Sequence, residues 1–170
     1  MDEDKKTFRR LVLSSTDLSQ AKRLVEFILE NELYLENTED KRTINRSLQT
    51  SAIVSYIRPF SGNYCKDDTF GKLDEKHLYT LNDDELKLHT HIKNLRNKVF
   101  AHTDSEVRGL KINITSFGNS KTAWSSSHNP FAPLPKELWL NFLEIINKVD
   151  GSIADEIVDM QGQFEENDSF

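Results

Sequence analysis

The residues of this chain that could do chemistry together lie near the end of one predicted helix. Arg96 is followed directly by the polar Asn97 and, six positions after the arginine, by His102. A guanidinium group has a planar set of donors that suits a phosphate. An imidazole of ordinary pKa can take or give a proton near neutral pH. The chemistry to consider is therefore contact with, and proton transfer around, a single phosphate group.

The spacing of this pair does not by itself decide whether the two side chains act together. On an unbroken helix, Arg96 and His102 would lie roughly 120° apart. They can converge on one phosphate only if the helix ends near Ala101 or if a second molecule completes the site. The alternative is structural, because His102 continues an apolar stripe three residues after Val99 and a cation suits a helix C-terminus.

The longer string from Leu95 to Asp104, LRNKVFAHTD, resembles the signature of HEPN-domain proteins. In that family an arginine is followed by a polar residue and, a few positions later, by a histidine. The abortive-infection-type branch is the most similar, and the architecture expected for most of the chain fits it. The resemblance implies a helical bundle, often dimeric, that cleaves RNA without a metal. Some members have lost activity and act as scaffolds or RNA-binding modules.

Carried onto this sequence, the resemblance implies a metal-independent endoribonuclease, as a toxin of a toxin–antitoxin pair or a phage-defence effector of abortive infection. His102 would take or give the proton during attack by the ribose 2′-OH. Arg96 would bind the phosphate and stabilise the charge that develops there. Asn97 and Asp104 would orient His102 or the RNA backbone. Two alternatives stay open: a catalytically silent bundle that binds RNA or a partner protein, and a purely structural helical domain.

Further candidate residues flank the motif on both sides. His89 lies seven residues before Arg96, so the two share a helix face within about 20°, and His89 could orient Arg96 or touch the same ligand. Lys93, Lys98 and Arg108 contribute to a local excess of positive charge. Bound RNA or a solvated helix face would each explain that excess.

The net charge of −6 is distributed unevenly along the chain. Residues 149–170 hold seven acidic and no basic residues, which leaves residues 1–148 at +1. This distribution permits single-stranded RNA as a partner, but it lacks the extended basic stripe of a duplex binder. The single cysteine, Cys65, excludes an internal disulfide framework and fits a cytoplasmic protein. No apolar run approaches a membrane span, and the charged N-terminus does not resemble a signal peptide.

Four histidines cluster in sequence and raise the question of a metal site: His77, His89, His91 and His102. His89 and His91 are two positions apart, so they point to nearly opposite sides of one helix and cannot hold one ion together. The chain has no His-Glu-x-x-His motif and no paired cysteines. We therefore predict no metal and no cofactor, and apart from the proposed role of His89 we expect these histidines on exposed helix surfaces.

Apolar periodicity predicts four helices. The first runs from Asp17 to about Glu36. The second runs from roughly Arg42 to near Ile57, where Pro59 is expected to end it unless the helix kinks through. The third, central helix spans Leu81–Asp104. Its capping box is Asn82 with Glu85. Its apolar stripe, expected to be largely buried at the core of the bundle, comprises Leu88, Ile92, Leu95 and Val99. The last helix starts near Pro135, and its inward stripe comprises Leu138, Phe142, Ile145, Val149, Ile153 and Ile157.

Two connections complete the predicted architecture. Residues 61–80 form a long loop with a short helical turn near Asp74–Tyr79. Alternating residues in 107–115 and 122–125 predict a β-hairpin. We therefore expect a mainly α protein, an HEPN-like four-helix bundle with a small β-hairpin inserted between the third and fourth helices.

The same prediction covers domain organisation and assembly. Residues 1–160 form one domain, and residues 161–170 form an acidic, frayed tail. We expect a homodimer that brings two copies of the Arg96–His102 segment together, because on one regular helix the pair diverges. Single-stranded RNA and an antitoxin or other protein are the further expected partners, and a membrane is not.

Overall fold

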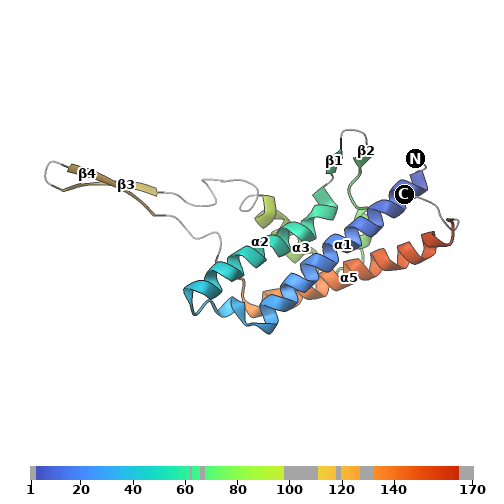
Figure 1. Ribbon diagram of the computed structural model, residues 1–170, viewed down its shortest axis with the longest axis horizontal. Coiled ribbons are helices and arrows are strands. Elements are labelled where there is room, and N and C mark those ends of the chain that lie inside the picture. Colours follow the sequence, from blue (N-terminus) through green and yellow to red (C-terminus); the bar gives the residue numbers. More distant parts are fainter. Residues whose placement is uncertain are drawn as a thin grey trace.

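The computed structural model describes residues 3–61, 63–65, 68–97, 111–117, 120–126 and 132–164. Within these ranges the protein is mainly helical, and three long helices lie side by side (Figure 1): α1 (Glu3–Glu30), α2 (Glu39–Ser61) and α5 (Lys136–Gln161). A shorter helix, α3 (Asp83–Leu95), packs on α2 and α5. No helix in the described part of the chain combines the length and the apolar character that crossing a membrane requires.

The hydrophobic core lies where α1, α2 and α5 face one another. Helix α1 buries side chains three or four residues apart, as a period of 3.6 requires: Leu18, Ala21, Val25 and Ile28. Helix α5 buries a matching stripe together with Trp139: Phe142, Ile145, Val149 and Ile153. This part of the stripe predicted for the last helix is confirmed, and the buried side chains of α1 follow the periodicity that predicted a helix there.

Helix α1 differs from its prediction at both ends. It begins at Glu3 rather than at Asp17, because the inward stripe continues back through Ser14 and Leu11 to Arg10. Asp17, the predicted first residue, therefore lies inside the helix, and its carboxylate pairs with Arg58 of α2. The helix stops at Glu30, short of the predicted Glu36. A 3₁₀ turn, η1 (Leu33–Leu35), follows it.

Helix α2 continues through its proline to Ser61. The end near Ile57 was therefore wrong, and the alternative, a helix that runs on through Pro59, is the one observed. Pro59 lies inside the last turn before Ser61, and its ring is buried. A proline this close to the helix end removes one backbone donor, which is a smaller loss than in mid-helix because few later hydrogen bonds depend on it. The carbonyl of Pro59 accepts a hydrogen bond from the Leu73 amide at 2.9 Å, which ties the following segment to the end of α2.

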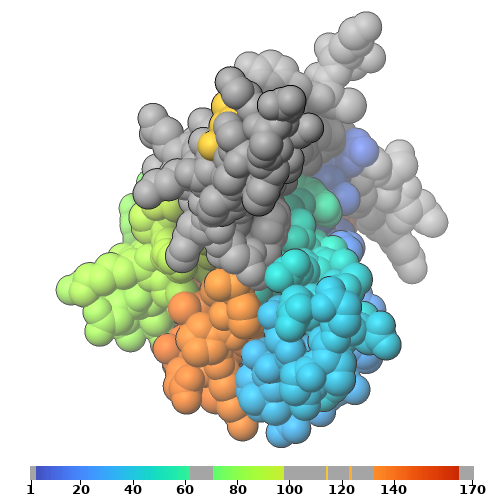
Figure 2. Space-filling model, turned by 90° about the vertical axis from the view of Figure 1, so that its left-hand side faces the viewer, coloured from blue at the N-terminus to red at the C-terminus, as the bar shows by residue number. Residues whose placement is uncertain are grey.

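Helix α3 begins as predicted, with Asn82 and Glu85 forming a reciprocal capping box. It lies beside the first turns of α5 (Figure 2) rather than at the centre of the bundle, so that part of the prediction was wrong. Ile92 is fully buried, Leu88 and Leu95 are half-buried, and Val99 lies outside the described residues. The central position belongs to α1, which packs along both α2 and α5.

Short elements occupy the segments between the helices. The predicted helical turn near Asp74–Tyr79 is confirmed as a 3₁₀ helix, η2 (Glu75–Leu78). Two short strands that we did not predict, β1 (Asn63–Cys65) and β2 (Asp68–Phe70), pair antiparallel. A second antiparallel pair consists of β3 (Lys111–Phe117) and β4 (Ser120–Ser126). In its register Lys111 lies opposite Ser126. In Figure 1 this pair lies apart from the helices.

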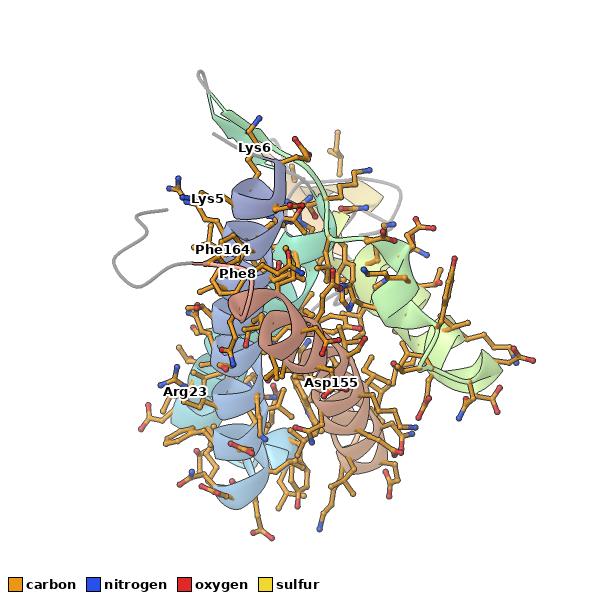
Figure 3. The ribbon with its side chains drawn as sticks, turned by 90° about the vertical axis from the view of Figure 1, so that its right-hand side faces the viewer. Lys5, Lys6, Phe8, Arg23, Asp155 and Phe164 are labelled. Atoms are coloured by element: carbon orange, nitrogen blue, oxygen red, sulfur yellow. The ribbon has the colours of Figure 1, made fainter. Side chains whose placement is uncertain are left out.

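The two ends of the described chain meet. After α5 ends, the ring of Phe164 packs edge-on against Phe8 of α1, with centroids 5.0 Å apart (Figure 3). The start of the predicted tail thus contacts the body of the protein. Residues 165–170 lie outside the described residues, so fraying of the tail stays a prediction there.

Candidate functional site

The motif begins where α3 leaves regular α-helical geometry. The helix ends at Leu95, and Arg96 and Asn97 continue it in a wider, π-helical turn. The Arg96 backbone amide is shared between the carbonyl oxygens of Ile92 and Lys93. Turns of this kind occur frequently at functional sites. Arg96 itself keeps right-handed helical backbone angles, and the course of the motif beyond Asn97 lies outside the described residues.

The Arg96 side chain is half-buried, and its partner among the described residues is polar and uncharged. Its Nη1 donates a hydrogen bond to Oδ1 of the neighbouring Asn97 at 3.0 Å, and an amide leaves the positive charge in place. In the described part of the chain no carboxylate lies within ion-pair distance of Arg96 or of the exposed Lys93, one turn earlier. The two side chains therefore present positive charge that an anion could use.

The remaining members of the predicted site fall in the segment that is not described. His102 and Asp104 of the predicted catalytic group lie outside the described residues, as do the predicted RNA-binding residues Lys98 and Arg108. The convergence of Arg96 with His102 thus stays a prediction. Asn97 is placed, and its contact is with Arg96.

His89 is part of the core and not part of an exposed helix surface. Its side chain is 5 % exposed, and its Nδ1 lies 2.9 Å from the Tyr56 hydroxyl. The ring also stands edge-on to Phe60, with centroids 4.9 Å apart. Burial, with the nearby Lys93 charge adding to it, lowers the pKa of His89 to about 4. His89 is therefore neutral at physiological pH, and its bond is to Tyr56, whereas we had proposed a contact with Arg96 or its ligand.

His77 is the second buried histidine, which corrects the expectation of an exposed position. Its Nδ1 lies 3.0 Å from the Ser152 hydroxyl. Its Nε2 lies 3.1 Å from a carboxylate oxygen of Glu156, but at an angle that makes no hydrogen bond. Burial lowers the pKa of His77, and the Glu156 charge works against that shift. Among the three of these histidines that the structure describes, only His91 is exposed as expected.

Metal-binding groups were sought across the described residues. No three side chains of His, Cys, Asp or Glu come together there in a way that could hold an ion. The predicted absence of a metal stays a prediction for the whole chain, because His102 and Asp104 lie outside that part.

Comparison of the chain with models of protein families, with curated proteins and with solved structures found no match. The resemblance to HEPN proteins therefore rests on the string from Leu95 to Asp104 and on the helical architecture.

Proposed function

We propose that this protein is a metal-independent endoribonuclease of the HEPN type, acting as a toxin or phage-defence effector. The observation that supports this most is the state of Arg96. It stands at a π-helical turn, and its charge meets no carboxylate among the described residues. The proposal includes an HEPN-like bundle with the β3–β4 hairpin between its third and fourth helices.

In the proposed reaction His102 removes the proton from a ribose 2′-OH. The 2′ oxygen then bonds to the adjacent phosphorus, and the bond from phosphorus to the 5′ oxygen of the next nucleotide breaks. That oxygen takes a proton and leaves as a 5′-OH, while the other fragment ends in a 2′,3′-cyclic phosphate. Arg96 stabilises the charge on the phosphate during this step. Asn97 holds Arg96 through their hydrogen bond, and Asp104 orients His102.

The proposed site is completed by a second copy of the chain. Two Arg96–His102 segments close together would supply one phosphate with groups from both protomers. Lys93, Lys98 and Arg108 would hold the RNA backbone on either side. Light scattering at micromolar concentration tests this part, and a monomer would contradict it.

The deciding experiment is cleavage of labelled single-stranded RNAs by the purified protein, free of any antitoxin. We expect cleavage in EDTA, a 2′,3′-cyclic phosphate product, and resistance of RNA with a 2′-deoxy sugar at the cut. His102→Ala and Arg96→Ala should each lower the rate by roughly two to four orders of magnitude. Melting temperatures of the same samples separate lost chemistry from lost stability.

Matched controls come from exposed residues of the same types. His91→Ala changes an exposed histidine on α3, and Arg23→Ala changes an exposed arginine on α1 (Figure 3). Both should cleave RNA at the wild-type rate. A dimeric wild-type protein that leaves diverse RNAs intact would favour the silent RNA- or protein-binding bundle instead.

A further inference from the structure

A pocket of about 270 Å³ opens beside the first turns of α1, away from the Arg96 motif. The segment from Gly71 to His77 forms a second wall, and Glu156 of α5 closes it. Figure 3 shows Lys6, another lining residue, on the first turns of α1. The volume lies near the lower end of the range for small-molecule sites.

Arg10 lines this pocket and is a buried charge that has no counter-ion among the described residues. Its side chain is 8 % exposed, and one Nη donates to the carbonyl oxygen of Pro59. Its buried Nε has no hydrogen-bond partner. No carboxylate of the described residues lies within ion-pair distance, and the acid that most affects its pKa, Asp17, is bonded to Arg58.

Such an arrangement costs stability unless something compensates the charge. A buried charged group normally has a partner of opposite charge, because desolvation is otherwise too unfavourable. The carbonyl of Pro59 belongs to the C-terminal turn of α2, whose partial negative charge offsets only part of that cost. Pro59 also has another donor, the amide of Leu73, so its carbonyl does not need Arg10.

The acidic residues around the pocket are mostly engaged elsewhere. Glu156 accepts from Lys76 at 2.8 Å, and the Asp74 carboxylate accepts from the Lys76 amide at 2.9 Å as the cap of η2. Glu3, at the exposed start of α1, is the lining carboxylate without a partner in the described part of the chain. Lys72 is exposed and unpaired among the same residues. Arg10 and Lys72 therefore leave the pocket with positive charge to spare.

We propose that this pocket binds the phosphate group of a small phosphomonoester, whose dianion supplies the counter-charge that Arg10 lacks. Arg10 contacts the phosphate at the base of the pocket and Lys72 at its mouth, since a guanidinium and an ammonium together match a doubly charged group. The buried imidazole of His77 lies on the same wall, with its Nε2 3.1 Å from the Glu156 carboxylate. This site is separate from the proposed ribonuclease site, so either can fail alone.

The test is calorimetric binding to the full chain in phosphate-free buffer. The probes are inorganic phosphate, adenosine 5′-monophosphate and, as the phosphate-free arm, adenosine. We expect both phosphate-bearing probes to bind and to raise the melting temperature, and adenosine to do neither. Binding of adenosine as strong as that of its monophosphate would overturn the proposal, as would no binding of either phosphate-bearing probe.

Two variants locate the binding. Lys72→Glu, at an exposed position, should weaken phosphate binding by roughly tenfold or more. Lys87→Glu reverses an exposed lysine on α3 and should leave the affinity unchanged. Equal losses of phosphate affinity in the two variants would show that only the overall surface charge matters, and would overturn the proposed site.

The variant Arg10→Met adds a test in which loss of a charged side chain should raise the melting temperature. Without phosphate this variant should melt at a higher temperature than wild type, because it removes a buried charge that lacks a counter-ion. It should also lose the response to phosphate. A lower melting temperature would assign Arg10 a structural role and count against the proposal, and an unchanged response to phosphate would overturn it.

Discussion

The regions around His89 and His77 bury the same side chain in different ways. His89 stands among the rings of Tyr56 and Phe60 and makes one neutral hydrogen bond. His77 lies against α5, between the Ser152 hydroxyl and the Glu156 carboxylate, at the wall of the Arg10 pocket. The first region is held by packing of apolar surface, and the second by polar contacts next to an open pocket.

The difference shows in the electrostatics of the two imidazoles. Burial lowers both pKa values, but Glu156 opposes the shift of His77, whereas the charge that acts on His89, that of Lys93, adds to its shift. A buried histidine without a counter-charge resists protonation strongly, and one beside a carboxylate resists it less. The predictions that follow test this contrast.

The largest expected effect comes from removing the aromatic ring that supports the His89 region. Phe142 is fully buried and its ring stands edge-on to Tyr56, with centroids 5.0 Å apart. Phe142→Ala should lower the free energy of unfolding by about 3–5 kcal/mol, through lost burial and the cavity left behind. Urea denaturation measures this. Leu140→Ala, on the exposed side of α5, is the control and should cost far less.

Acid should destabilise the protein mainly through His89. Its pKa is about 4 in the folded protein against an ordinary value of 6.5, so between these values the unfolded chain binds more protons. Its contribution to stability is therefore complete above pH 6.5 and is lost as the pH falls toward 4. The loss at pH 5 should be about 2 kcal/mol.

The variants His89→Gln and His77→Gln separate the two regions in that pH window. Removing the titrating group at His89 should flatten the pH dependence of the melting temperature between pH 6.5 and 4. The substitution at His77 should flatten it less, because Glu156 favours the charged form there. A larger effect from His77→Gln would reverse the comparison.

Removing the hydroxyl group that bonds to the imidazole should lower the free energy of unfolding more at His89 than at His77. Tyr56→Phe leaves Nδ1 of His89 without its partner in the core, and we expect a loss of about 1–2 kcal/mol. Ser152 is only partly buried, so water can replace its hydroxyl, and Ser152→Ala should cost about 0.5 kcal/mol. Parallel urea titrations of the two variants compare them. Equal losses would indicate that the Ser152 site is as dry as the core.

The smallest effect should come from the ion pair of Lys76 with Glu156, whose side chains are 49 % and 21 % exposed. Lys76→Ala should change the free energy of unfolding by less than about 1 kcal/mol. The difference from wild type should shrink further in molar salt, because screening weakens exposed pairs. A large effect that is insensitive to salt would show that Glu156 must be neutralised for η2 to dock.

Several features of this fold follow from local sequence. The capping box of Asn82 and Glu85 was predictable because both partners lie within one helical turn. The apolar stripes of α1 and α5 follow from the period of the helix, which any window of the sequence displays. The class of the protein as mainly helical was therefore available before any coordinates.

The limits of α1 and α2 were not predictable in the same way. The segment Glu3–Arg10 is rich in charged residues and shows no apolar period that would predict a helix. The structure shows that it is helical and that Arg10 and Leu11 are buried against neighbouring elements. Pro59 favours a helix end locally, yet burial of its ring and the contact with Leu73 keep it inside the last turn of α2. Tertiary packing overruled the local preference in both cases.

The sequence by itself thus determined the helical class, the cap of α3 and the Arg96–His102 motif with the chemistry it suggests. Only the tertiary structure decided which polar side chains are buried and what they meet. Arg10, His77 and His89 bond to groups 49, 75 and 33 positions away along the chain. Local patterns predict contacts within a turn or two, whereas these pairings exist only because packed helices bring distant segments together. For the same reason no sequence motif predicts the Arg10 pocket, whose lining residues come from separate segments of the chain.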